Sequence, residues 1–196
     1  MIGLSTAAVY ILQTIGSLYL LIVLLRFILQ LVKADFYNPL SQFIVRATHP
    51  LLKPLRKVIP SFAGLDLASL VLAILVQLVL MALVLILMGF GLDNPLQLLI
   101  WSIIGVTALF IKVFFFALII SVILSWVAQG SHNPAAELIN QICEPLLAPI
   151  RRILPSLGGL DLSPIVAFLI LNLIDMLVVR NLAVMTGMFK GLSLAV

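Results

Sequence analysis

The chain has 196 residues, of which 64% are hydrophobic and only 9% are Asp, Glu, Lys or Arg. A soluble domain carries about 25% charged residues, so this composition excludes a soluble globular protein. The net charge of +4 comes from cations beside apolar runs, where membrane topology and lipid explain them better than nucleic acid does.

Four apolar runs are each longer than the roughly 20 residues that a helix needs to cross a bilayer. They cover residues 4–32, 67–92, 96–128 and 162–189. The first run is too long for a cleaved secretory signal and lacks a basic start, so we expect it to be retained. The third is long enough that it should tilt, kink or protrude. The sequence therefore predicts an all-α membrane protein with four transmembrane helices.

Between the spans, one segment occurs twice: PLLKPLRKVIPSFAGLDL at 50–67 and PLLAPIRRILPSLGGLDL at 145–162, identical at 11 of 18 positions. The same offset of 95 residues aligns Asn38-Pro39 with Asn133-Pro134. This pattern predicts two repeats, 1–95 and 96–196, each consisting of a span, an amphipathic interfacial helical elbow and a second span. The elbows cover 34–66 and 130–161. Because two crossings separate them, both elbows lie on one side, and the repeats are parallel.

Each elbow begins at an Asn-Pro pair, where Asn is a favoured N-cap and Pro a favoured first helical residue. Proline clashes with the preceding helical turn, so Pro50 and Pro145 are expected to end this first helix. Pro54 and Pro149 then start a second, shorter helix. The turn that follows contains Asp66 or Asp161, which are expected to cap the next span or to favour its positive end.

The cations are concentrated in the elbow regions, which by the positive-inside rule places both elbows in the cytoplasm and both termini outside. Basic amphipathic helices are also attracted to anionic lipid, by about 1 kcal/mol per cation near the surface. Two interpretations stay open: the cations only set the topology, or they dock lipid or a partner protein. The docking candidates are Arg46, Lys53, Arg56, Lys57, Arg151 and Arg152.

Two charges fall inside predicted spans. Lys112 precedes Trp126 by 14 residues and Asp175 follows Leu162 by 13, so both lie about 20 Å above the elbow side. An unpaired charge there costs at least about 2.5–3.5 kcal/mol, so we expect the two to pair. The pair either locks the third and fourth spans together or lines an ion or proton path, and Arg180 belongs to the same candidate cluster.

Arg26 lies about two turns inside the elbow end of the first span. A long basic side chain at this depth is expected to extend to the interface or to contact Asp35.

No residue pattern supports catalysis, a cofactor or a metal. His49 and His132 do not occupy equivalent positions in the repeat and lack further ligands at metal-binding spacing. The lone Cys143 is expected to be a small apolar filler. The sequence therefore predicts a protein that is not an enzyme and needs no cofactor.

The segments DFYNPLSQFIVRATHPLLKPLRKVIP and NP…EPLLAPIRRILPSLGGLD together resemble the YggT family of small bacterial membrane proteins, also called YlmG-like, which has plastid relatives. The resemblance covers almost the whole chain, and the doubled pattern P-x-x-x-P-(L/I)-R-(K/R)-(V/I)-(I/L)-P is specific. The two-unit form is similar to that of the proteobacterial members.

This resemblance implies roles in tolerance of osmotic or salt stress, in potassium uptake, in cell division and envelope organisation, or in plastid nucleoid distribution and cofactor assembly onto a cytochrome. It supports a non-enzymatic scaffold or assembly factor of the bacterial inner membrane, with elbows that dock anionic lipid or partner proteins. A second copy of the chain is also a candidate partner. The alternative is a potassium or proton transport component that uses the intramembrane charges.

Overall fold

The structure is a computed structural model, which describes residues 2–62, 64–92, 94–127, 133–154, 161–189 and 192. Its helices are α1 (Ile2–Leu31), α2 (Pro39–Val58), α3 (Leu67–Leu87), α4 (Pro95–Val127), α5 (Pro134–Ile153), α6 (Ser163–Ile174), the π-helical segment η1 (Asp175–Val179) and α7 (Arg180–Met185). Among the residues that the structure describes, four stretches are long and apolar enough to cross a membrane: Thr6–Leu31, Leu67–Leu87, Pro95–Ser125 and Ser163–Met185. The prediction of an all-helical protein with four spans is confirmed.

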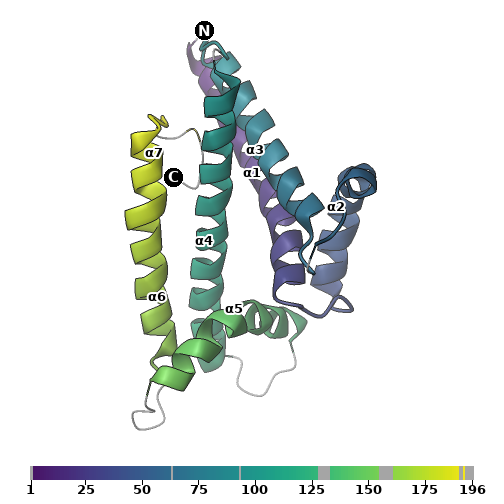
Figure 1. Cartoon of the computed structure of the whole chain (residues 1–196), viewed down its shortest axis with the longest axis vertical. Helices are drawn as coiled ribbons and strands as arrows, with labels where there is room; N and C mark the ends of the chain where they lie inside the picture. The colour runs from purple at the N-terminus through teal and green to yellow at the C-terminus, as the bar shows by residue number, and fades with distance from the viewer. Residues whose placement is uncertain are drawn as a thin grey trace.

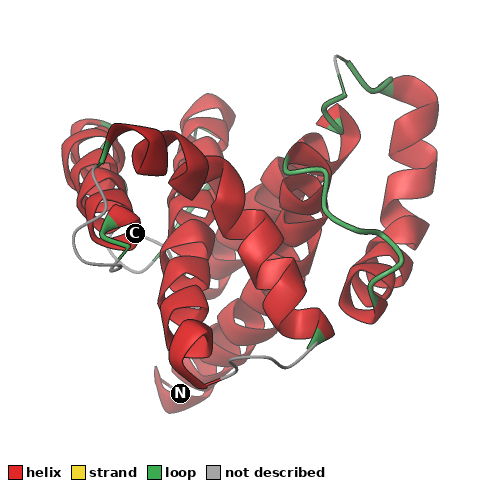
Figure 2. Ribbon diagram, turned by 90° about the horizontal axis from the view of Figure 1, so that it is seen from below, coloured by secondary structure: helices red, strands yellow, loops and turns green. Residues whose placement is uncertain are grey.

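The spans form a bundle in which α1 and α3 lie side by side and α4 separates them from α6 and α7 (Figure 1). Helices α1 and α4 run in one direction, and α3 and α6 return. Both elbow helices, α2 and α5, therefore lie toward the same end of the bundle (Figure 1). Figure 2 views the molecule from this end, with α5 crossing beneath the spans. The two units are thus parallel repeats, as the sequence predicts.

Apolar side chains from both units share one buried cluster. Leu24 and Ile28 of α1, Leu118 of α4 and Leu147 of α5 all belong to it. The outward faces of the spans are also apolar, as Ile15 of α1 illustrates, because they are solvated by lipid rather than water. Close packing between helices, rather than exclusion of water, therefore holds this bundle together.

Helices α1 and α3 pack tightly against each other at a glycine. A Cβ placed on Gly16 would lie 2.1 Å from Cδ2 of Leu80. Small residues at such crossings allow two membrane helices to approach and gain dispersion contacts. Gly16 thus sets the distance between the two spans of the first unit.

Each elbow helix is continuous, so the prediction that Pro50 and Pro145 end a helix is wrong. Both prolines lie inside their helices, as do Pro54 and Pro149. Prolines four residues apart share one helical face, and all four are exposed. The carbonyl groups that each proline leaves without a partner therefore lie on an exposed face, where the loss is tolerated. The helix bends instead of ending, and Figure 1 shows the two halves of α2 running in different directions.

The predicted helix starts are confirmed at both elbows. The side-chain oxygen of Asn38 accepts a hydrogen bond from the backbone N–H of Leu40 at 2.9 Å. Asn133 caps α5 in the same way through Ala135, also at 2.9 Å. Proline occupies the first turn of each helix, where its missing N–H costs nothing.

We predict that Gly16→Val destabilises the protein by about 1–3 kcal/mol, because the added methyl groups overlap with Leu80. The unfolding midpoint in detergent measures this effect. The matched control is Gly16→Val combined with Leu80→Ala, which frees the space and should recover most of the loss. If the double variant is no more stable than Gly16→Val alone, the contact does not set the spacing of α1 and α3.

Candidate functional site

An ion pair ties the end of the first elbow to the start of the next span. Nη2 of Arg56, in the last turn of α2, contacts Oδ2 of Asp66, the N-cap of α3. The Asp66 carboxylate also accepts hydrogen bonds from the hydroxyl of Ser69 and, at 3.3 Å, from its backbone N–H. The Asp66 side chain is only 4% exposed, so its charge is almost completely enclosed by these partners. We call this pair the first clasp.

The second unit repeats the same connection with a more open geometry. Nε of Arg151 donates to Oδ2 of Asp161 at 2.9 Å, and Nη1 donates to Glu144 at 2.9 Å. Oδ1 of Asp161 accepts from the backbone N–H of Ser163, the first residue of α6, at 2.9 Å. Asp161 is 45% exposed in this second clasp. Both clasps join residues ten apart in the sequence, and the sequence pattern did not predict either pair.

The clasps shift the pKa of both carboxyl groups downward. Burial alone would raise the pKa of Asp66, but the hydrogen bonds from Ser69 and Arg56 outweigh it and hold the pKa below its ordinary value. The same balance, with Ser163 and Arg151 as donors, lowers the pKa of Asp161. Both aspartates are therefore bound as carboxylates. The prediction that they act at the start of the next span agrees with their contacts, but their arginine partners come from the preceding elbow.

Helix α2 exposes an apolar stripe beside its cations. Its buried face includes Ile44 and Leu52, which pack onto the bundle. A second row of apolar side chains lies beside this face and remains exposed: Leu40, Phe43, Leu51 and Val58. The exposed cations of α2 occupy the adjoining polar face. We call the second row the α2 stripe. An exposed apolar row flanked by Lys and Arg is typical of a helix that lies in a membrane interface.

The second elbow differs because α5 buries part of its corresponding row. Phe43 of the α2 stripe is 59% exposed, whereas its repeat equivalent Leu138 is 5% exposed. Ile153, the equivalent of Val58 at the end of the row, stays 82% exposed. Helix α5 crosses beneath the bundle and packs against α4 and α6 (Figure 2). The two elbows therefore expose different parts of this row.

The first unit is also bonded to the second elbow. Nδ2 of Asn38 donates to the backbone oxygen of Pro134 at 2.6 Å, and the backbone N–H of Asp35 donates to Oε1 of Gln141 at 2.8 Å. Both donors lie in the connection between α1 and α2. The elbow end of the molecule is consequently one linked surface, with the cations of both elbows on it.

The intramembrane charges gather where the fourth span changes its helical geometry. Nε of Arg180 donates to Oδ2 of Asp175 at 2.9 Å, and the backbone N–H of Arg180 bonds the backbone oxygen of Asp175. In a regular α-helix, residues five apart point about 140° away from each other. The π-helical segment η1 brings them onto one side, and such segments are frequent at functional sites. The sequence pattern gave no sign of η1.

Lys112 of α4 lines the same pocket, of about 160 Å³, as Asn172, Asp175 and Arg180. The structure thus brings together the cluster that equal depth predicts. The cluster includes an ion pair of Asp175 with Arg180, within one span. Direct pairing of Lys112 with Asp175 stays a prediction.

Arg26 does not behave as predicted. It is only 8% exposed, so its side chain does not extend to water, and it lies 5.2 Å from the ring centroid of Phe36. The Asp35 carboxylate instead accepts from the backbone N–H of Tyr37 at 2.8 Å. The reason is that α2 folds back over this part of α1 and covers the guanidinium.

Cys143 is buried in the core cluster, where burial raises its pKa to about 11 despite an opposing hydrogen bond from Ser121. Its thiol is therefore protonated at neutral pH and packs as an apolar group. His49 lies beside a pocket of about 250 Å³ against α2, and His132 falls outside the described residues.

Comparison with known proteins places this arrangement in a family. The family model described as CCB3/YggT matches residues 5–87 and 100–182, one match for each unit. The protein belongs to the CCB3/YggT family. It is 77% identical to an uncharacterized protein of Pseudomonas aeruginosa over 195 residues, 99% of each chain. It is 38% identical to the YggT protein of Escherichia coli K12 over 170 residues, 85% of this chain and 86% of that one.

A plant protein, YlmG homolog protein 2, chloroplastic, of Arabidopsis thaliana, is 41% identical over 66 residues, 32% of this chain and 25% of that one. None of these three names states an activity. No solved structure matches the chain. The YggT match includes both clasps and the charge cluster, since each of their residues falls inside the matched ranges.

We predict that the two clasps differ in strength. Asp66→Asn should destabilise the protein by about 3 kcal/mol. This value is at the lower end of the range for removing one partner of a buried ion pair, because Arg56 is half exposed. The repeat-equivalent Asp161→Asn should cost about 1 kcal/mol or less, since that pair faces water. Unfolding in detergent at pH 7 measures both.

The pH dependence follows from the lowered pKa of Asp66. Its contribution is fully present above the ordinary carboxyl pKa of about 3.9 and is lost as the pH falls through the lower folded-state value. Wild type and Asp66→Asn should therefore converge in stability below about pH 4. A constant difference between them down to pH 3 would contradict the clasp as a charged contact.

Proposed function

We propose that this protein is a non-enzymatic scaffold or assembly factor of the bacterial inner membrane, acting in envelope homeostasis and osmotic-stress tolerance. Its basic elbows face the cytoplasm and dock anionic lipid or partner proteins, and both termini lie outside. The observation that carries this proposal is the α2 stripe with its flanking cations at the linked elbow surface. Such a face combines apolar insertion with electrostatic attraction to an anionic surface.

The docking candidates divide into two groups: cations that form the clasps and cations that do not. Arg56 and Arg151 hold the clasps, so part of their charge is neutralised by carboxylates. The other docking candidates are exposed and belong to neither clasp: Arg46, Lys53, Lys57 and Arg152. Three of these four lie on α2, beside the α2 stripe. The first elbow is therefore the main docking face in this proposal, and α5 supports it from below the bundle.

The alternative function is transport of an ion or proton through the charge cluster. The observation that favours it is the π-helical segment η1, which aligns Asp175 with Arg180 beside Lys112 at a small pocket. Charged groups inside membrane spans often mark ion or proton pathways. The structural interpretation is that the same pair fastens the fourth span.

The orientation of the elbows can be tested by cysteine labelling. In a Cys143→Ala background, the repeat-equivalent changes Lys57→Cys and Arg152→Cys place a thiol at an exposed position of each elbow helix. We predict that both are labelled only from the cytoplasm, because Lys and Arg are retained there. Asn94→Cys, in the connection between α3 and α4, should be labelled only from the opposite side. Labelling of either elbow from outside would reject the proposed orientation.

Lipid docking can be tested with the cations outside the clasps. We predict that Arg46→Gln, Lys53→Gln, Lys57→Gln and Arg152→Gln, combined in one variant, lower the enrichment of phosphatidylglycerol around the protein severalfold. Each cation near the surface contributes about 1 kcal/mol. The measurement is the ratio of phosphatidylglycerol to phosphatidylcholine in polymer-bounded particles extracted from mixed bilayers.

The control for this variant is Phe43→Ser with Leu51→Ser, which weakens apolar insertion but should keep the preference for the anionic lipid. If the four-Gln variant keeps wild-type enrichment and changes only its orientation in the membrane, the cations are topology signals and the docking proposal fails.

The two functions predict different outcomes for the charge cluster. Asp175→Leu alone strands Arg180, whereas Asp175→Leu with Arg180→Met replaces both partners by apolar side chains and should be the more stable of the two. Under the scaffold proposal, this double variant still supports growth at high osmolarity. A stable double variant that fails to support growth, together with potassium or proton flux through wild-type proteoliposomes that Lys112→Met abolishes, would favour the transport function.

A further inference from the structure

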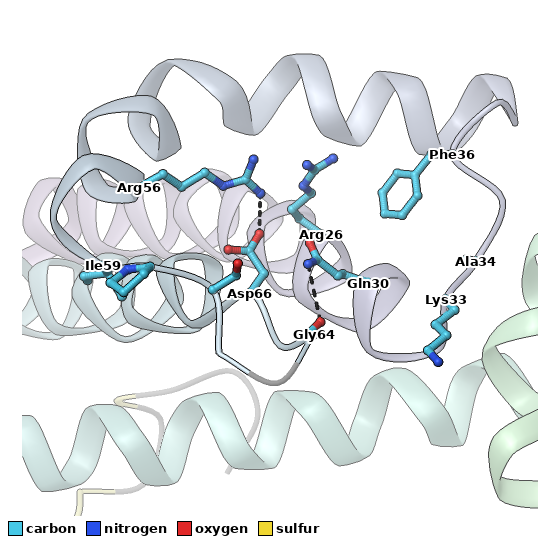
Figure 3. Close-up of a pocket in the computed structure, with 11 residues that line it drawn as sticks. Arg26, Gln30, Lys33, Ala34, Phe36, Arg56, Ile59, Gly64 and Asp66 are labelled. Atoms are coloured by element: carbon cyan, nitrogen blue, oxygen red, sulfur yellow. Dashed lines mark hydrogen bonds and ion pairs between the residues drawn. The ribbon is translucent and has the colours of Figure 1, made fainter.

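A pocket of about 780 Å³ opens at the elbow end of the first unit. It lies between the end of α1, the end of α2 and the turn that precedes α3 (Figure 3). Its charged lining consists of Arg26, Lys33 and Arg56, with Asp66 as the one carboxylate among the described lining residues. Three cations against one anion leave a net charge of two positive in the pocket.

Arg26 is the unusual member of this set. It is 92% buried, yet its Nε and Nη1 atoms have no hydrogen-bond partner among the residues that the structure describes. A buried guanidinium with unbonded N–H groups is costly, and structures compensate such a charge with an anion. Figure 3 shows its guanidinium group next to that of Arg56, in the space beneath α2.

The nearby carboxylate does not supply that anion. Asp66 is bonded to Arg56 and to both donors of Ser69, and no bond joins it to Arg26 in the part of the chain described. The ring of Phe36 covers one side of the Arg26 guanidinium at 5.2 Å but offers no acceptor oxygen. A second pocket of about 250 Å³, which Arg26 also lines, adds Lys53 and His49 rather than an acid. The described residues therefore supply no acceptor for these two N–H groups of Arg26, and the cations around it favour an anion from outside the chain.

We propose that this pocket binds the phosphate of an anionic phospholipid. The Arg26 guanidinium is the two-pronged donor, through Nη2 together with one of the two unbonded nitrogens, and Arg56 lies beside it. The planar guanidinium fork matches two phosphate oxygens. Arg26 lies five residues before the end of the span at Leu31, about 7.5 Å from its end, so the pocket that it lines lies near the level where lipid headgroups are expected. The pocket volume falls within the range of roughly 300–1,000 Å³ that suits small-molecule ligands.

A lipid fits better than a free phosphate because the pocket lies between a membrane span and an amphipathic helix. Its floor is a membrane span, and α2, which carries the exposed stripe, covers it. Acyl chains could thus remain in the bilayer while the phosphate enters the pocket.

The second unit keeps the clasp but lacks the buried cation. The repeat position of Arg26 is occupied by Ser121, whose hydroxyl bonds Oδ1 of Asn140 at 3.0 Å. The site is therefore a property of the first unit alone, and it distinguishes two otherwise similar halves.

This inference deepens the lipid half of the proposed function and rests on it, but the two can fail separately. Enrichment of lipid around the elbows tests the exposed cations, whereas a saturable site for one lipid molecule tests the pocket. None of the four cations in the enrichment variant lines the 780 Å³ pocket.

The test is native mass spectrometry of the full chain in detergent, titrated with phosphatidylglycerol. We expect one molecule to bind saturably, and Arg26→Met to weaken it at least roughly tenfold, since a charge-assisted two-pronged bond is lost. Arg26→Lys keeps the positive charge but not the planar guanidinium, so its affinity for phosphatidylglycerol should lie between those of the wild type and Arg26→Met. The matched control is Ser121→Ala, at the same position of the second unit, which should bind within about twofold of wild type. Wild-type affinity in Arg26→Met would overturn the proposal.

Two further measurements identify the ligand and keep the test valid if Arg26→Met does not fold. Inorganic phosphate or glycerol 3-phosphate in excess should not displace the lipid, and displacement would assign the site to a free phosphate instead. Without any variant, phosphatidylglycerol should raise the unfolding midpoint of the wild type more than phosphatidylcholine does. Equal shifts with the two lipids would overturn the proposal even if Arg26→Met did not fold.

Discussion

The contact between an arginine at the end of each elbow and an aspartate at the start of the next span organises this molecule. A membrane span that begins at an interface leaves backbone N–H groups without partners, and a carboxylate placed there satisfies them. The carboxylate in turn needs a cation, and the elbow helix supplies it from its last turn. The Arg–Asp contact therefore fixes the point at which the chain leaves the elbow and enters the bilayer as the next span. The direction of the second span, and hence the shape of each unit, follows from it.

Because the clasp is common to both units, the differences between them show where the chain has specialised. The first unit encloses its clasp, covers a buried arginine with α2 and leaves an apolar stripe exposed. The second unit opens its clasp to water and packs α5 against α4 and α6, which buries part of the corresponding row. It instead carries Lys112, Asp175 and Arg180 around a small pocket. The exposed apolar stripe thus belongs to one half and the charge cluster to the other.

The two halves are joined at the elbow end by the bonds from Asn38 and Asp35 to α5. A ligand that moved α2 would therefore also act on the element that supports α4 and α6. The same linkage connects the first elbow, through α5, to the helices that carry the charge cluster of the second unit. The two proposed functions therefore use parts of the molecule that are joined by direct contacts.

Much of the fold was determined by sequence alone. The four spans, the parallel repeat and the Asn-Pro caps follow from hydropathy, a constant offset of 95 residues and local backbone chemistry, none of which depends on distant contacts. The equal depth of Lys112 and Asp175 likewise follows from helical rise. These properties are local or periodic, and a single chain read in order contains them.

Tertiary structure decided the rest. Whether Pro50 ends or bends its helix depends on which face is exposed, because only an exposed carbonyl can lose its partner cheaply. Whether Arg26 reaches water depends on how far α2 folds back over α1. The ion pair of Asp175 with Arg180 depends on a π-helical turn that no 3.6-residue period reveals. In each case the outcome depends on how the helices pack or on local helical geometry, which the order of the residues does not contain.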